Sequence, residues 1–275
     1  MTFISKPVTI LGTMSEHFET VELCGMSLAS VHTQQLIDHV FGSLRAGRGG
    51  WLVTANLDFL RRYVRDPGAR DVYAGADLRV ADGMPLVWAS HLRGRPLPER
   101  VAGSSLLVPL CQVAAREGHS VYLLGGDPGV AERAAERLRA AAPGLQIAGL
   151  MAPRISAEVS EADVAEAAEA LAAARPALVF VAFGSPKQEL VIARLRRLLP
   201  GAWWMGVGIS FSFLAGHVAR APVLLQNLGL EWAFRLAQEP ERLLRRYVIE
   251  NIPFAFELFG RAALDRLRDA GRRVP

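Results

Sequence analysis

From Trp51 onward, the sequence repeats one unit: a short apolar run, a turn that contains Gly, Asp or Ser, and an amphipathic stretch of ten or more residues. Alternating strands and helices of this kind build a mostly parallel sheet flanked by helices. The pattern therefore predicts an α/β fold, for which 51% hydrophobic residues supply a large core. The predicted strands are Trp51–Thr54, Leu78–Ala81, Ser120–Leu124, Gln146–Leu150, Leu178–Phe183 and Trp203–Val207, with an earlier one near Val21–Met26.

Three turns that follow predicted strands carry signals for the start of a helix. Asp127 and Ser185 each precede a proline, which predicts an N-cap residue followed by Pro at the first helical position. The turn Asp82–Pro85 is a looser version of the same pattern. In an open parallel sheet such turns meet at the carboxyl ends of the strands, where free helix amides attract phosphate. We therefore expect a phosphate-binding cleft at that edge.

One stretch is long enough to cross a membrane, because the 22 residues from 198 to 219 contain no Asp, Glu, Lys or Arg. Glycines, serines and a proline interrupt it, among them Pro200, Gly206 and Gly208. This composition is typical of a buried strand followed by a glycine-rich turn. We expect the stretch to belong to the core of the sheet.

After Gly229 the alternation ends, and the remaining sequence predicts helical segments broken at Pro240 and Pro253. We call residues 231–275 the appendage and expect residues 1–230 to form one α/β domain. The appendage interleaves arginines with bulky apolar residues, and from Trp232 to the end nine Arg stand against six Asp or Glu. This pattern suits binding to an anionic membrane surface. It equally fits a solvated arginine face over a packed apolar stripe.

Several functional classes lack support in the sequence. Cys24 and Cys111 are too few for a disulfide framework, which fits a reducing cytoplasm. Residues 1–16 show no export signal, and the spacing of His32 and His39 does not indicate a metal site. No nucleic-acid-binding module is recognisable. Walker A, GxGxxG, GxSxG and HExxH motifs are all missing, which weakens nucleotide-hydrolase, oxidoreductase, serine-hydrolase and metalloprotease interpretations.

Polar residues at the predicted strand ends form a series of short motifs. They are Thr54-Ala55-Asn56, Ala81-Asp82-Gly83, Arg100–Ser105, Gly184–Glu189, Gly206–Gly208, Arg220–Pro222, Gly229–Trp232 and Arg235. In order and spacing this series resembles the WecG/TagA/CpsF family of bacterial glycosyltransferases, glycosyltransferase family 26, from about Val21 to Phe256. The resemblance implies a Rossmann-like core and an inverting, metal-independent transfer of a sugar from UDP to a polyprenyl-diphosphate-linked saccharide. It also implies a cytoplasmic protein, peripheral on the inner face of the cell membrane, with no cofactor.

The resemblance assigns roles to four residues of the predicted α/β domain. Asp82 matches the general base that takes a proton from the acceptor hydroxyl. Thr54, Asn56 and Gln188 match residues that line the same pocket and can hydrogen-bond sugar hydroxyls. Each also has a purely structural interpretation, because Asp82 could cap a helix, and Thr54 and Asn56 could satisfy loop amides. Gln188 likewise fits a capping box with Ser185.

The resemblance also assigns arginines to the diphosphates. Arg100 matches a residue suited to the charge of the departing UDP, since guanidinium groups must stabilise that charge where no metal is used. Arg235, Arg242 and Arg245 fall on the family's R-x6-R-x2-R spacing and share one helical face if Pro240 only kinks the segment. We expect these three to bind the lipid diphosphate.

Two positions depart from the family pattern, since Ser105 and Ser212 stand where many members carry Asp. Ser and Asp cap helices comparably, so the first change is mild, but the second removes a possible acceptor for the donor nucleotide. The expected reaction is transfer of an N-acetylmannosamine-type sugar to a lipid-linked N-acetylglucosamine. The alternatives are UDP-glucuronate or another UDP-hexose as donor for exopolysaccharide, or a non-catalytic UDP-sugar-binding scaffold. A homo-oligomer is also possible, because apolar side chains of the appendage could pack on a second subunit.

Overall fold

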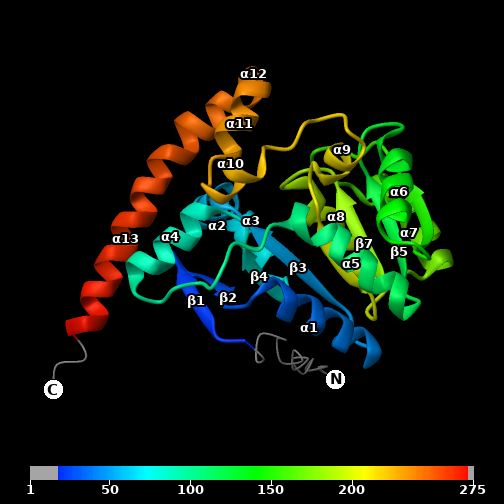
Figure 1. Cartoon of the computed structure of the whole chain (residues 1–275), viewed down its shortest axis with the longest axis horizontal. Helices are drawn as coiled ribbons and strands as arrows, with labels where there is room; N and C mark the ends of the chain where they lie inside the picture. Colours follow the sequence, from blue (N-terminus) through cyan, green and yellow to red (C-terminus); the bar gives the residue numbers. More distant parts are fainter. Residues whose placement is uncertain (1–17, 272–275) are drawn as a thin grey trace, which may run out of the picture.

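The computed structural model describes residues 18–271, and its centre is a six-stranded sheet in which every pair of neighbours is parallel (Figure 1). The strand order is β4-β3-β8-β7-β5-β6. The strands are β3 (Gly50–Ala55), β4 (Leu78–Ala81), β5 (Ser120–Gly125), β6 (Gln146–Met151), β7 (Leu178–Ala182) and β8 (Trp203–Gly206). Each coincides with a predicted strand to within one or two residues. The α/β, mostly parallel fold is therefore confirmed.

The expected single strand near Val21–Met26 is instead a hairpin of two strands. β1 (Thr20–Leu23) and β2 (Met26–Ala29) pair antiparallel, with Leu23 opposite Met26. The two turn residues, Cys24 and Gly25, have φ of 50° and 84°. Positive φ at both central residues is the turn that matches the twist of a two-residue hairpin. Cys-Gly is not the usual residue pair for this turn. The sequence therefore predicts one continuous apolar strand where the structure has two.

Helices cover both faces of the sheet. The elements are α1 (Thr33–Arg45), α2 (Leu57–Arg65), α3 (Pro67–Ala74), α4 (Met84–Arg93), α5 (Gly103–Glu117), α6 (Val130–Ala141), α7 (Glu161–Ala174), α8 (Lys187–Leu195), the 3-10 turn η2 (Arg196–Leu198) and α9 (Ser210–Leu214). Helices α2, α3, α4, α7 and α8 share one buried cluster with alternate strand residues, and α1, α5, α6 and α9 share the other. In β3, for example, Trp51 and Val53 face the first layer and Leu52 the second.

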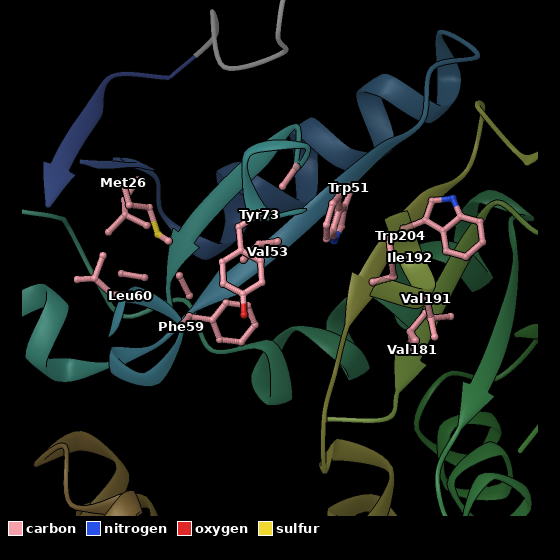
Figure 2. Packing of buried hydrophobic residues seen from close by; sticks show 14 of the residues in the cluster. Met26, Trp51, Val53, Phe59, Leu60, Tyr73, Val181, Val191, Ile192 and Trp204 are labelled. Atoms are coloured by element: carbon pink, nitrogen blue, oxygen red, sulfur yellow. The ribbon is translucent and has the colours of Figure 1, made fainter. Parts of the chain in front are cut away.

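The first layer packs large apolar side chains against the sheet (Figure 2). Trp51 of β3 lies opposite Trp204 of β8, and both side chains are at most 1% exposed. Beside them, Phe59 of α2 stacks on Tyr73 of α3 with ring centroids 4.9 Å apart. Large aromatic side chains in such positions bury much apolar area, which fixes the helices on the sheet. The strand ends that carry the polar motifs are therefore held rigidly.

Ligands of such sheets bind where neighbouring strands lead to opposite faces. Strand β3 is followed by α2 of the first layer, whereas its neighbour β8 is followed by α9 of the second. The crevice at their carboxyl ends, next to Ala55 and Gly206, is thus one such point. The stretch 198–219, considered above as a membrane span, supplies β8 and α9. Within residues 18–271, no helix has the length and apolar character needed to cross a membrane.

The predicted N-caps at Asp127 and Ser185 are wrong. Helix α6 begins at Val130, whose N–H donates to the carbonyl of Asp127, and α8 begins at Lys187 with Pro186 before it. Gly129 explains the first error. It is the N-cap of α6 and its φ of 77° is left-handed, so the right-handed helix can begin only after it. The turn between Asp127 and Val130 comes before the helix.

The C-terminal part is helical throughout, as predicted, but its breaks differ. Its elements are α10 (Val223–Asn227), α11 (Glu231–Gln238), α12 (Pro240–Leu244), the π-helical segment η3 (Arg245–Asn251) and α13 (Ile252–Gly271). The break at Pro240 is confirmed, since Glu239 has φ −133° and ψ 59°. No break occurs at Pro253, which is the second residue of α13. The π-helical segment η3 runs directly into α13, and the N–H of Ile252 donates to the carbonyl of Tyr247, so the chain stays helical through the proline.

Helix α13 runs beside α4 along the edge of the molecule (Figure 1). Its buried residues, Phe254, Leu258 and Ala262, belong to the same apolar cluster as α2 and α4. The appendage thus shares part of its core with the α/β domain. The expectation of no export signal within Met1–Glu16 and the last residues of the appendage lie outside the described range.

Candidate active site

A cleft of about 470 Å³ lies at the carboxyl ends of β3, β4 and β8, and the C-terminal helices line its other side. This volume is in the range of small-ligand sites. Seven of the eight predicted site residues line it: Thr54, Asn56, Asp82, Arg100, Gln188, Arg235 and Arg242. The structure therefore brings together residues that are up to 188 positions apart in the sequence.

Asp82 follows β4 and lies half-buried at the base of the cleft. Its Oδ2 accepts a hydrogen bond from the backbone N–H of Gly103, the first residue of α5, at 3.1 Å. Burial raises the pKa of this carboxyl from 3.8 to about 7, against the lowering effects of the Gly103 N–H and the Arg100 guanidinium. A base with a pKa near neutrality is well matched to proton abstraction. The side chain does not cap α4, where Gly83 is the N-cap.

Asn56 has both a structural and an available hydrogen-bonding group. Its Oδ1 caps α2 by accepting from the N–H groups of Asp58 and Phe59 at 3.0 and 3.1 Å. The Nδ2 amide remains as a donor on the cleft side. Nearby, Thr54 is buried, and a Cβ at Gly103 would lie 2.8 Å from its Oγ1. Only glycine at position 103 thus allows α5 to approach β3 so closely.

Gln188 does not form the capping box that its spacing from Ser185 suggested. Its Oε1 accepts from the backbone N–H of Gly208 at 3.0 Å, which ties α8 to the loop after β8. The next residue, Glu189, is not among the residues that line the cleft. It is 2% exposed, and burial raises its pKa to about 7, against hydrogen bonds with Gln188 and Ser185. A Glu in the first turn of a helix is common, so the sequence gives no signal for this burial.

Arg100 is held by a carboxylate from the appendage. Its Nη1 donates to Oε2 of Glu231, the first residue of α11, at 3.0 Å. Arg220 reaches the other oxygen of Glu231 at 3.7 Å and donates to Oγ of Ser105 at 2.8 Å. Ser105, one of the two departures from the family pattern, is thus a partner of an arginine. Ser212, the other departure, is not among the residues that line the cleft.

One of the three arginines predicted for the appendage lies outside the cleft. Arg235 and Arg242 line the cleft, but Arg245 does not. Its side chain is 84% exposed and pairs with Glu250 at 3.3 Å. Arg246 lines the cleft instead. Because Pro240 starts a new helix and a π-helix follows it, the assumed continuous α-helical face does not exist.

Arg246 joins the appendage to the core through a buried carboxylate. Asp58 of α2 is 2% exposed and pairs with Arg61, Arg62 and Arg246 at 2.8, 3.0 and 2.7 Å. Glu250 pairs with Arg61 from the appendage side at 2.7 Å. These three arginines outnumber the two carboxylates, so the cluster keeps a positive charge beside the cleft. Spacing of three and four residues predicts the pairs of Asp58 with Arg61 and Arg62, but not the distant partner.

Within the described residues, no group of three or more His, Cys, Asp or Glu side chains is placed to hold a metal ion. The expectation of a metal-independent reaction stays a prediction. The cations that line the cleft are Arg100, Arg235, Arg242 and Arg246. Planar guanidinium groups bind phosphate oxygens in pairs, so this set is suited to diphosphates.

Comparison with known proteins agrees with this geometry. The profile of the Glycosyl transferase WecG/TagA/CpsF family matches residues 21–268, nearly the whole chain. The chain belongs to this family. The resemblance found in the sequence is therefore confirmed, and the protein is a glycosyltransferase. One relative in the family, from Bacillus spizizenii, is named N-acetylglucosaminyldiphosphoundecaprenol N-acetyl-beta-D-mannosaminyltransferase. It is 35% identical over 202 residues, which cover 74% of this chain and 76% of that protein.

Proposed function

We propose that this protein transfers an N-acetylmannosamine-type sugar from a UDP donor to a polyprenyl-diphosphate-linked N-acetylglucosamine during assembly of a cell-surface polysaccharide. The observation that carries the proposal is the placement of Asp82, desolvated and next to Arg100, in a cleft whose opposite side holds further arginines. A base and a cation beside it are what a displacement at a sugar carbon with a diphosphate leaving group requires. The name of the Bacillus spizizenii relative supports the choice of sugar and acceptor.

In the proposed reaction, the Asp82 carboxylate takes the proton of an acceptor hydroxyl. The acceptor oxygen attacks the anomeric carbon of the donor from the face opposite the diphosphate. A new carbon–oxygen bond forms, the bond to the β-phosphate breaks, and its electron pair leaves with UDP. The configuration at the anomeric carbon is therefore inverted. Arg100 lies beside the base and would stabilise the charge on the departing diphosphate, while Asn56 and Gln188 orient sugar hydroxyls.

The two diphosphates would use different arginines. Arg100 belongs to the loop before α5 and serves the donor, whereas Arg235, Arg242 and Arg246 come from the C-terminal helices and serve the acceptor. This division follows from the layout of the cleft, since the core lines one side and the appendage the other. It replaces Arg245 of the predicted trio by Arg246, because only Arg246 lines the cleft.

The test is UDP release from a panel of UDP-sugars, with and without a short-chain polyprenyl-diphosphate-linked N-acetylglucosamine. The panel contains UDP-N-acetylmannosamine, UDP-N-acetylglucosamine, UDP-glucuronate and UDP-glucose, each with EDTA and with Mg²⁺. Release from UDP-N-acetylmannosamine that needs the acceptor and persists in EDTA supports the proposal. Release from UDP-glucuronate or UDP-glucose alone would replace the donor. UDP binding without turnover of any donor would favour the scaffold interpretation.

We also propose that the C-terminal helices attach the protein to the inner face of the cell membrane. Large apolar side chains remain exposed there: Val223, Leu224, Leu228, Leu244, Ile249, Phe256, Leu264 and Leu267. Phe256 is 74% exposed, and the C-terminal helices also carry the exposed side chains of Arg242 and Arg245. Apolar groups beside arginines bind an anionic bilayer through both burial and charge. The acceptor named for the relative is itself lipid-linked.

Co-sedimentation with vesicles tests this attachment. Binding to vesicles that contain phosphatidylglycerol, and weaker binding to neutral vesicles or at high salt, is the expected result. If the same apolar face instead covers a second subunit, analytical ultracentrifugation without vesicles should give a concentration-dependent dimer. A protein that is monomeric at all concentrations and does not bind vesicles would contradict both interpretations.

A further inference from the structure

Glu231 is a carboxylate that the C-terminal helices place between two arginines of the cleft region. It is the first residue of α11 and one of the residues that line the cleft. Its Oε2 accepts from Arg100 at 3.0 Å, and its Oε1 lies 3.7 Å from Nε of Arg220. The side chains of Arg100 and Glu231 are each only 17% exposed. At this burial the pair is screened less by solvent than a surface ion pair.

The same three charges act on the proposed base, which lines the same cleft as Arg100 and Glu231. Arg100 from the loop before α5, Arg220 from the segment before α10 and Glu231 from α11 all act on Asp82, together with the N–H of Gly103. The two arginines favour the ionised form of Asp82, whereas Glu231 disfavours it. Without Glu231, two guanidinium groups would face Asp82 with no counter-charge. The carboxylate therefore offsets charge at the position where a proton must be taken up.

We propose that Glu231 is a positioning residue: it holds Arg100 at the cleft and offsets the arginine charges around Asp82. The position of α11 against the core therefore controls how readily Asp82 takes a proton. This inference rests on the proposed function, because it gives Asp82 the role of base. Glu231 does not touch the reacting atoms in this arrangement. It acts through Arg100 and through the electrostatic effect of its charge on Asp82. The base in the core therefore depends on a residue of the appendage.

The physical consequence is a signature in the pH dependence. Asp82 must be ionised to take a proton, so the acidic limb of kcat/KM follows its pKa. Replacing Glu231 by Gln removes a negative charge but keeps a side-chain oxygen that can accept from Arg100. The acidic limb should then move to lower pH by roughly 0.5–1 pH unit. A weaker base also lowers kcat on the plateau, by at most about 3- to 10-fold for this shift, because proton transfer depends on base strength.

The experiment measures kcat/KM and kcat from pH 5 to 9 for wild type, Glu231→Gln, Glu231→Asp and Glu257→Gln. Glu257 is the matched control, since it lies on α13 and pairs with Arg65 and Arg261. We expect the shift of the acidic limb in Glu231→Gln alone, with an intermediate position in Glu231→Asp. An unmoved limb in Glu231→Gln, even with lower activity, would overturn the proposal and leave Glu231 a structural role.

A second measurement separates this inference from the proposed function. If wild type transfers no sugar from any donor, the proposed function fails, and the pH dependence of thermal unfolding then tests Glu231. The unfolding temperature of wild type should fall between pH 5.5 and 8. In Glu231→Gln, with Asp82 present, this fall should be smaller, because the pKa of Asp82 is raised less. Glu231→Gln should have no such effect in an Asp82→Asn background, because the titrating group is gone. Equal effects in both backgrounds would contradict the coupling.

Discussion

The sheet and the C-terminal helices are held in place by different forces. All five residues of β7 are buried, whereas α11 contains no buried residue at all. The sheet is stabilised by apolar burial on both faces, which does not depend on charged groups. The C-terminal helices are joined to it by one apolar stripe of α13 and by ion pairs at Asp58 and Glu231. The chemistry proposed for the core and the lipid binding proposed for the appendage therefore meet at charged contacts.

The largest expected effect tests whether Asp82, a residue of the core, is the general base. Asp82→Asn keeps the shape of the side chain but removes the base, so kcat should fall by about 10²- to 10⁴-fold. UDP binding, measured by calorimetry, should stay within a few-fold of wild type because the arginines are unchanged. Turnover close to that of wild type would remove Asp82 from the mechanism.

Truncation of one large side chain in each region sharpens the comparison. Trp204→Ala removes a side chain that is 1% exposed and should cost about 3–5 kcal/mol of unfolding free energy. Phe256→Ala should change the unfolding free energy by less than about 0.5 kcal/mol, because that side chain is exposed. Its effect should appear in the affinity for anionic vesicles instead. Urea denaturation and vesicle co-sedimentation measure the two quantities on the same proteins.

Two adjacent arginines provide a matched pair within the appendage. Arg246→Ala should raise the KM for the lipid-diphosphate acceptor by about 10- to 100-fold, since Arg246 lines the cleft. Arg245→Ala removes the same charge one residue away, from a side chain outside the cleft, and should change this KM by less than about 3-fold. Arg246→Lys keeps a charge that can pair with Asp58 and should give an intermediate value. The opposite ranking would restore the spacing-based prediction.

The difference between the regions also explains what the sequence could predict. Apolar runs identified every strand of the sheet, and strand ends in a parallel sheet necessarily meet at one edge. That topology brought Thr54, Asp82 and Gln188 into one cleft without knowledge of any distance. The order of the strands and the burial of Glu189 depend on packing between distant segments, which a single sequence does not encode locally.

The appendage was harder to predict because its side chains are placed by non-local charge pairs. The spacing of Arg235, Arg242 and Arg245 assumed one continuous α-helix. The break at Glu239 and the π-helix after Leu244 changed the face, since hydrogen bonds from i to i+5 make a wider turn. The partner that fixes Arg246, Asp58, lies 188 residues earlier in the chain. No periodicity can reveal such a pair.

The smallest expected effect concerns stability against pH. The pKa of Asp82 is about 7 in the folded protein, against an ordinary value of 3.8, so between these values the folded state binds more protons than the unfolded one. The free energy of unfolding must therefore fall as the pH rises through this window. Glu189, with a pKa of about 7 against 4.5, contributes in the same direction.

Asp82→Asn should remove part of this slope and stabilise the protein at pH 8 by about 1–2 kcal/mol relative to pH 5.5. Asp163 is the control, because hydrogen bonds with Ser156 and Ser160 lower its pKa to about 2, and it stays ionised across the whole range. Asp163→Asn should shift unfolding temperatures equally at pH 5.5 and 8. A slope unchanged by Asp82→Asn would mean that this carboxyl is not desolvated in the folded state. If Asp82→Asn unfolds with a higher free energy than wild type at pH 8, the carboxyl of Asp82 lowers the stability of the folded protein at that pH. The active site then retains Asp82 for its chemistry and not for stability.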